Sequence, residues 1–181
     1  MNSSRPSYLS RLARIVVGVD PAASVSEDSD LTGIIVAGLG WDGCAYVLDD
    51  LSGKYSPDGW GRRVVDAYYA FEADRVVIEV NQGGAMAEHV IRTVDRRVPI
   101  KGVRATRGKA LRAEPVAALY EQGRVFHVRP FLELEDQLCT FNPADPPAKS
   151  PDRMDALVWA LTDLLLVPQY VVRHLDNLPP G

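Results

Sequence analysis

The stretch Arg14-Ile15-Val16-Val17-Gly18-Val19-Asp20 is the most informative one for the fold. Its apolar core is rich in β-branched residues, which predicts a buried strand, and the strand ends on an acid. Two further strands are expected at 31–39 and 44–48, joined by a tight turn at 40–43 where an Asp-Gly pair favours a hairpin. The fold therefore begins with three strands in an antiparallel meander.

The rest of the chain alternates helices with short strands. Helical periodicity and capping residues predict helices at 57–73, 84–98, 109–122, 131–141 and 151–167, with strands at 75–80, 100–103 and 126–128. On the helix at 84–98 we expect Met86, Val90, Ile91 and Val94 to share the apolar face. This order predicts an α/β fold with an RNase H-like mixed sheet, antiparallel and then parallel, and helices on both faces. We expect an N-terminal arm at 1–13, one domain at 14–167 and a C-terminal tail at 168–181.

Composition excludes several classes of protein. The 181 residues suffice for one domain, and 46% hydrophobic with 24% charged residues is an ordinary globular balance. Cys44 and Cys139 form no CxxC pair, which argues against a disulfide scaffold and fits a reducing compartment. No apolar run approaches the roughly 18 residues of a membrane span, and no signal peptide is evident. We therefore expect a soluble intracellular domain.

Three acids stand at the ends of predicted elements. Asp20 ends the first strand, Glu79 lies near the end of the fourth, and Asp155 lies in the first turns of the last helix. Ligand sites of open sheets lie at such strand ends. Clustered carboxylates repel one another unless a hard cation lies between them, and two such ions about 4 Å apart suit a phosphoryl displacement. The acids therefore predict a site for two divalent cations, Mg²⁺ or Mn²⁺.

Each acid also has a purely structural interpretation. Asp20 can end its strand through an Asx turn, Glu79 can face solvent on an edge strand, and Asp152 can favour the helix dipole. Helical phase puts Asp155 at the margin of the apolar face and Asp152 further toward the polar side. We therefore expect Asp155 to bind metal directly and Asp152 to assist, with Asp30 as one further candidate.

The segment 92–112 is strongly basic. It holds eight basic residues and one acid, a net charge of +7, while the remainder of the chain carries −11 of the total −4. Such a run can be an ordinary solvated face, but beside a metal site it also suits a nucleic-acid backbone. We expect phosphate contacts from Arg104, Arg107, Lys109 and Arg112.

Two glycine motifs do not indicate nucleotide binding. Residues 38–43 match GxGxxG, but a strand follows where a dinucleotide fingerprint needs a helix. Residues 102–110 resemble a P-loop, but Ala110 stands where Mg²⁺ binding needs Ser or Thr. A dinucleotide enzyme and a P-loop ATPase are therefore excluded for this chain.

Five stretches carry a family resemblance: VGVDPA at 17–22, LTGIIVAG at 31–38, IEVNQGG at 78–84, KALRAEPVAALYEQG at 109–123 and SPDRMDALVWAL at 150–161. In this order they resemble the C-terminal nuclease domain of the large terminase subunit of tailed bacteriophages. The resemblance implies an RNase H-like fold and metal-dependent cleavage of packaged concatemeric DNA. It also implies that Asp20, Glu79 and Asp155 bind the metals, whereas Asp152 stands where relatives vary in residue type.

The resemblance implies partners as well. Double-stranded DNA would be the substrate, and an ATPase motor domain of the same subunit, the small terminase subunit and the portal would be protein partners, with no membrane. The location would be the cytoplasm of a bacterial host, with a phage or prophage as the source. The ATPase motor is missing here, so the chain looks like an excised or separately encoded nuclease domain.

Three alternatives remain open. A Holliday-junction resolvase of the RuvC type shares the fold and similarly has two acids three residues apart on its last helix. A non-catalytic packaging module would dock DNA or the portal through its basic face. A phosphotransferase of the actin-like fold has the same element order, but a second half and phosphate-binding loops are lacking.

Overall fold

A computed structural model describes residues 11–21, 31–80, 85–106, 108–142, 144 and 150–166 of the protein. The strands, in chain order, are β1 (Leu12–Asp20), β2 (Gly33–Gly40), β3 (Ala45–Asp50), β4 (Arg75–Glu79), β5 (Ile100–Val103) and β6 (Val125–His127). They form one sheet in the order β5-β4-β1-β2-β3-β6. The pairs β1–β2 and β2–β3 are antiparallel, whereas β1–β4, β4–β5 and β3–β6 are parallel. The predicted mixed sheet is therefore confirmed.

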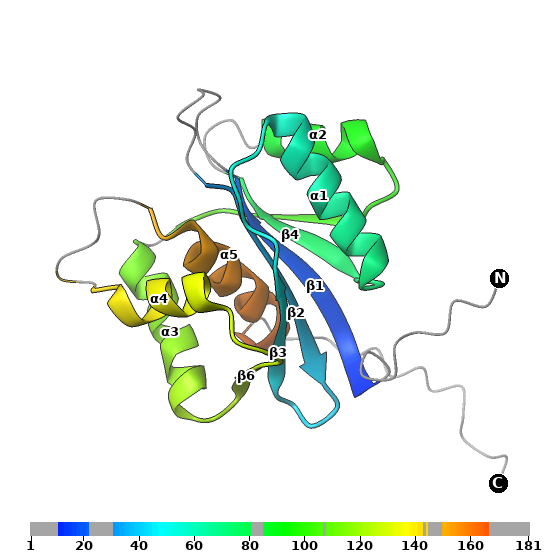
Figure 1. Ribbon diagram of the computed structural model, residues 1–181. Helices are drawn as coiled ribbons and strands as arrows, with labels where there is room; N and C mark the ends of the chain where they lie inside the picture. The colour runs from blue at the N-terminus through cyan, green and yellow to red at the C-terminus, as the bar shows by residue number, and fades with distance from the viewer. Residues whose placement is uncertain are drawn as a thin grey trace, which may run out of the picture.

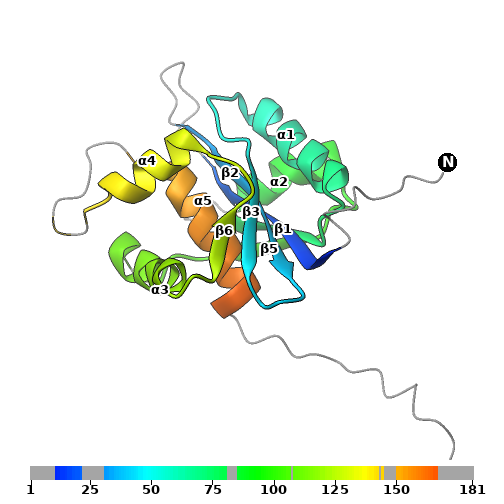
Figure 2. The same ribbon diagram turned by 60° about the horizontal axis from the view of Figure 1, so that its bottom comes forward.

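Helices cover both faces of this sheet, as Figures 1 and 2 show. The helices are α1 (Pro57–Ala70), α2 (Ala85–Val94), α3 (Lys109–Glu121), α4 (Leu132–Thr140) and α5 (Asp152–Leu161), and α5 continues as the π-helical segment η2 (Thr162–Leu166). One face carries α1 and α2, and the other carries α3, α4 and α5. No helix in the described ranges is both long enough and apolar enough to cross a bilayer.

The alternation of side chains along the strands separates two cores. On β1, Ile15, Val17 and Val19 pack with α1 and α2, whereas Val16 packs with α3, α4 and α5. On β4, Val76 and Ile78 face the first core, and Val77 faces the second. Because successive residues of a strand point to opposite faces, Asp20 and Glu79 fall on the face of α5.

Two glycines let α5 approach the sheet very closely. A Cβ atom on Gly18 would lie 2.3 Å from the carbonyl oxygen of Ala156, and one on Gly33 would lie 2.0 Å from that of Asp152. Neither position therefore tolerates a side chain without moving the α5 backbone. Gly33 pairs with Asp20 across β1 and β2, so the first turn of α5 lies over the end of β1.

Most of the predicted elements are confirmed to within a few residues. The hairpin turn is present, with the Gly40 N–H donating to the Cys44 carbonyl at 2.8 Å and with Gly43 at a φ of +80°. Ser56 caps α1 by accepting from the Gly59 N–H, as its position before Pro57 predicts. The prediction for Met86 is wrong, because its side chain on α2 is 68% exposed.

Candidate active site

The first two acids lie side by side at the ends of neighbouring parallel strands. Val19 of β1 pairs with Ile78 of β4, and the next residues along these strands are Asp20 and Glu79. The carboxylate of Glu79 belongs to a buried residue on a strand that lies between β1 and β5. The alternative of a solvent-facing edge position for Glu79 is therefore excluded.

The third acid comes from the helix that covers these strand ends. Asp155 lies in the first turn of α5 and is only 2% exposed. Asp152, one turn earlier, is 6% exposed, and its backbone touches Gly33 opposite Asp20. We refer to the four acids Asp20, Glu79, Asp152 and Asp155 as the acidic cluster.

Burial and mutual repulsion weaken the acidity of two members of the acidic cluster. Burial, followed by the charges of Asp155, Glu79 and Asp152, raises the pKa of Asp20 to about 8 against the opposing influence of Lys109. Burial also raises the pKa of Asp155, against the opposing influence of Lys109 and Arg112. Burial and mutual repulsion therefore disfavour the fully charged state of the acidic cluster in the metal-free protein.

Two cations from α3 approach the acidic cluster. The Nζ atom of Lys109 lies 2.5 Å from Oδ2 of Asp155 and 2.6 Å from Oγ of Ser150. Arg112 lies 3.5 Å from Oε2 of Glu79 and 3.6 Å from Oδ1 of Asp155. Both residues were expected to contact phosphates. In the structure, both contact carboxylates of the acidic cluster.

Trp159 is a residue of this site that sequence analysis did not single out. Its indole N–H donates to Oε2 of Glu79 at 2.9 Å, and the guanidinium of Arg112 stacks over its ring at 4.6 Å from the centroid. Trp159 follows Asp155 by four residues on α5, a spacing that puts both side chains on one face of a helix. This four-residue spacing is the sequence feature from which Trp159 could have been predicted to lie beside Asp155.

The acidic cluster has the donors for a hard divalent cation. Within the described residues, no three His, Cys, Asp or Glu side chains are gathered tightly enough to form a ready-made metal site. The oxygen atoms of Asp155 and Glu79 are instead held by Lys109, Arg112 and Trp159. Carboxylates whose charged forms are disfavoured by burial and mutual repulsion nevertheless fit Mg²⁺ or Mn²⁺, which prefer oxygen ligands.

The prediction that Asp152 points toward a polar side of the last helix is wrong. All ten residues of α5 are buried, because the helix packs against β1 and β2 on one side and against α3 and α4 on the other. A helical-phase argument assumes one solvated face, and α5 has none. Asp152 and Asp155 are therefore not distinguished by burial.

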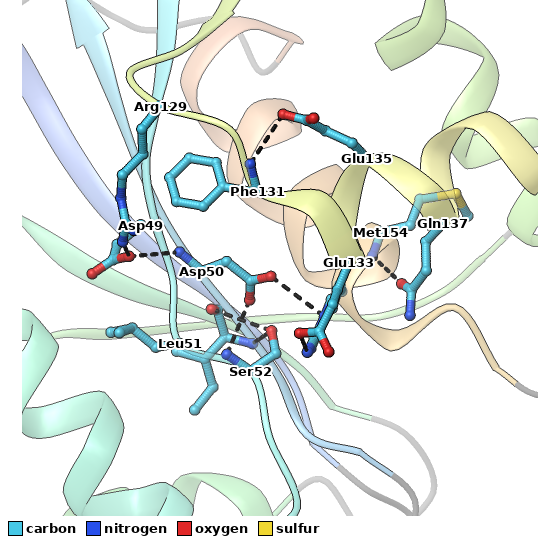
Figure 3. Close-up of polar contacts among 12 residues, drawn as sticks. Asp49, Asp50, Leu51, Ser52, Arg129, Phe131, Glu133, Glu135, Gln137 and Met154 are labelled. Atoms are coloured by element: carbon cyan, nitrogen blue, oxygen red, sulfur yellow. Dashed lines mark hydrogen bonds and ion pairs between the residues drawn. The ribbon is translucent and has the colours of Figure 1, made fainter.

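Side chains of α4 hold the beginning of α5 (Figure 3). Pro151 at the N-cap provides no side-chain hydrogen bond, and Oε1 of Gln137 accepts from the Met154 N–H at 3.1 Å instead. Arg153 lies 3.4 Å from Asp50 of β3 and also pairs with Glu133 of α4. The first turn of α5, which carries two acids, is thus fixed from outside the helix.

Other residues of the basic segment pair within the protein or lie outside the described ranges. Arg92 pairs with Glu88 at 3.7 Å and Arg97 with Asp95 at 3.0 Å; both arginines are exposed, and both acids are half-buried. Arg104 is exposed where the chain leaves β5 for α3. Arg107 and Asp30, both named from the sequence, lie outside the described residues.

A second buried carboxylate lies at the other end of α5. Asp163 in η2 is 2% exposed and lies 2.6 Å from Lys101, 3.4 Å from Arg14 and 3.7 Å from Arg75. These cations come from β5, β1 and β4. We refer to Arg14, Arg75, Lys101 and Asp163 as the basic cluster.

Comparison with known proteins adds to this geometry. Residues 17–164 match the sequence profile of a family described as terminase RNaseH-like domain. The fold is similar to that of the large terminase nuclease from thermophilic phage G20c, with a TM-score of 0.58 and 13% identity over 82% of this chain and 81% of that chain. No curated protein sequence matches the chain significantly.

Two further structures have similar folds. The human cytomegalovirus terminase nuclease domain, soaked with Mn and bound to an inhibitor, gives a TM-score of 0.59 and 12% identity over 90% of this chain and 87% of that chain. Thermus thermophilus RuvC in complex with a Holliday junction substrate gives a TM-score of 0.50 and 18% identity over 82% of this chain and 91% of that chain. The predicted RNase H-like fold is confirmed by these similarities.

Proposed function

Because the chain belongs to the terminase RNase H-like domain family, we propose that it is a metal-dependent endonuclease that cleaves double-stranded viral DNA during genome packaging. The observation that carries the proposal is the acidic cluster. Its carboxylates come from two strand ends and one helix; Glu79, Asp152 and Asp155 are buried, Asp20 is half-buried beside them, and burial with mutual repulsion raises the pKa of Asp20 to about 8. Gathering carboxylates in this way is costly unless a cation offsets their repulsion.

The proposed metal ligands are Asp20, Glu79 and Asp155, with Asp152 as an auxiliary ligand. These residues would hold two divalent cations, Mg²⁺ or Mn²⁺, which would supply activation of an attacking water and stabilisation of the departing 3′ oxygen of the phosphodiester. Glu79 is oriented by the indole N–H of Trp159, and the first turn of α5 is held by Gln137. A fixed orientation of ligand oxygens favours metal binding because less freedom is lost.

The proposed DNA contacts are Arg104, Arg107, Lys109 and Arg112. Arg104 is exposed beside the strand ends that carry the acids, and Lys109 begins the helix that reaches the acidic cluster. Cationic side chains near the cluster offset its repulsion toward phosphate and bind the DNA backbone independently of sequence. The wider packaging setting, with an ATPase motor domain, a small terminase subunit, a portal and the host cytoplasm, is part of the same proposal.

Plasmid nicking tests this function. Supercoiled DNA is incubated with the purified protein and Mn²⁺ or Mg²⁺, with and without excess EDTA, beside the Asp155→Asn variant. We expect nicking that requires the metal and is lost in the variant. A wild-type protein that binds DNA but never nicks it would favour the non-catalytic docking module instead.

The second candidate function is a Holliday-junction resolvase. It is favoured by the fold similarity to RuvC, a protein described in complex with a Holliday junction substrate. A resolvase of this type is a dimer that cuts branched DNA symmetrically. Its test is the mass in solution together with cleavage of a four-way junction against a linear duplex of the same sequence. A monomer without junction preference excludes it.

A further inference from the structure

Lys109 and Arg112 both contact Asp155, but they differ in their freedom to leave it. Arg112 is 12% exposed at its side chain, stacks on Trp159 and reaches Glu79 as well as Oδ1 of Asp155. Lys109 is 40% exposed at its side chain and contacts Oδ2 of Asp155 and the hydroxyl of Ser150. Arg112 is therefore enclosed by its partners, whereas Lys109 has a flexible stem with one side toward solvent.

The ammonium of Lys109 occupies the oxygen that a metal at Asp155 needs. Mg²⁺ binds a carboxylate oxygen at about 2.0–2.1 Å, and the Nζ atom of Lys109 already lies 2.5 Å from Oδ2 of Asp155. Two cations at such distances from one oxygen repel each other strongly. A divalent cation on this oxygen therefore favours the withdrawal of Lys109 from its present position.

The start of α3 is suited to a phosphate, which can replace Asp155 as the partner of Lys109. Lys109 is the first residue of α3, and the N-cap residue Gly108 provides no side-chain acceptor for the N–H groups of the first turn. A Cβ atom on Gly108 would meet no atom of the described residues within 4 Å. Helix N-termini attract anions, and an outward-turned ammonium adds to that attraction.

We propose that Lys109 is a displaceable counter-ion. In the metal-free protein it neutralises Asp155, and it moves to a DNA phosphate when a divalent cation takes its place on the carboxylate. This inference rests on the proposed nuclease function and adds a coupling to it. Because each ligand removes Lys109 from the position that opposes the other, metal and DNA each strengthen binding of the other by the same factor.

The first test compares two lysine variants by calorimetric titration with Mn²⁺ in the absence of DNA. Lys109→Met removes the competing charge but keeps the length of the side chain. The matched control is Lys101→Met, because Lys101 also pairs with a buried aspartate of the same helical rod, Asp163, at 2.6 Å. We expect Lys109→Met to bind Mn²⁺ about tenfold more tightly, within the usual range of site couplings, and Lys101→Met to bind as the wild type does. Unchanged or weaker binding by Lys109→Met overturns the proposal.

The second test measures the coupling from the side of the DNA. Anisotropy of a labelled duplex is recorded with and without Ca²⁺, which replaces the catalytic ion. We expect Ca²⁺ to strengthen DNA binding by about tenfold in the wild type and by a clearly smaller factor in Lys109→Met. An equal factor in both proteins overturns the proposal.

Asp155→Asn separates failure of this inference from failure of the function. If wild-type Mn²⁺ binding does not depend on Asp155, the proposed function itself fails. If Asp155→Asn abolishes Mn²⁺ binding while Lys109→Met leaves it unchanged, only the role of Lys109 is refuted. Thermal melts verify folding, and Lys109→Gln repeats both measurements should the Met variant be poorly folded.

Discussion

The two ends of the α5–η2 rod bury carboxylates in opposite electrostatic surroundings. At the N-terminal end, the carboxylates of Glu79 and Asp155 meet Lys109 and Arg112, and Asp20 lies close enough to be affected by their charges. At the C-terminal end, the carboxylate of Asp163 meets the three cations of the basic cluster. Both ends are buried against the same sheet.

The difference separates a structural ion cluster from a candidate active site. The carboxylate of Asp163 joins η2 to the beginnings of β1 and β4 and to β5, so it fastens the end of the α5–η2 rod to the sheet. The acidic cluster holds together despite repulsion that raises the pKa of Asp20 to about 8. Carboxylates gathered against burial and mutual repulsion are typical of a site that binds cations.

The largest effect is expected at the acidic cluster and concerns activity. Asp155→Asn removes a proposed metal ligand, so we expect nicking in Mn²⁺ to fall by about a thousandfold or more, since metal catalysis supplies several kcal/mol at about 1.4 kcal/mol per tenfold. DNA affinity without added metal should be unchanged or higher because one repulsive charge is gone. Asp58→Asn, an exposed partner of Arg62 on α1, is the control and should cleave normally. Full activity of Asp155→Asn removes this residue from the site.

The same substitution at the other end of the rod should act on stability instead. Asp163→Asn leaves three cations without their carboxylate, and we expect the free energy of unfolding to fall by about 3 kcal/mol, the lower end for a broken buried pair because Arg75 and Lys101 are partly exposed. Asp155→Asn should leave metal-free stability unchanged or higher, because burial raises the pKa of Asp155 and so disfavours its charge. Urea titrations of the two variants measure both values. Equal losses of unfolding free energy in the two variants would contradict the distinction between a structural ion cluster at one end and a candidate active site at the other.

A third prediction concerns pH. The folded protein holds a proton on Asp20 up to about pH 8, whereas the unfolded chain releases it near its ordinary pKa of 3.8. Stability from this group is therefore complete below the unfolded pKa and is lost as pH rises through the folded value. Asp20→Asn should flatten the decline in metal-free stability between pH 4 and 8, and Asp58→Asn should not. If the free energy of unfolding falls with pH equally in the wild type and in Asp20→Asn, the raised pKa of Asp20 is contradicted.

The smallest effect is expected for the side chain that caps α5. Gln137→Ala removes the acceptor of the Met154 N–H, and we expect a loss of about 1 kcal/mol, as for a helix N-cap. Gln122→Ala, at an exposed position after α3, should cost less. Because the capped turn carries Asp152 and Asp155, Gln137→Ala should also weaken Mn²⁺ binding. A loss of stability with unchanged Mn²⁺ affinity would separate the cap from the acidic cluster.

Sequence analysis could predict the sheet and its helices because local patterns specify them. Three elements are specified by neighbouring residues alone, and all three are present: the strand formed by the β-branched run before Asp20, the Asp-Gly turn and the Ser-Pro start of α1. The three acids at element ends could likewise be proposed from the positions of Asp20, Glu79 and Asp155 alone. The structure then brings these residues to one side of the sheet.

Other features depend on contacts between distant segments. The burial of Asp152 follows from α3 and α4 packing over a helix whose sequence looks amphipathic. Residues of the basic segment have different surroundings: some lie on the exposed surface, one pairs with Asp163 and two contact the acidic cluster. A count of charges along the chain cannot predict which residue has which partner. The exposure of Met86 on α2 has the same origin, since helical phase does not say how much of an apolar face a neighbour covers.

The most direct test of the central claim is anomalous diffraction from crystals soaked in Mn²⁺. The account predicts anomalous peaks among the carboxylates of Asp20, Glu79 and Asp155, with the ammonium of Lys109 withdrawn from Asp155. Mn²⁺ peaks found only elsewhere, or none in crystals whose acidic cluster is open to solvent, would contradict it.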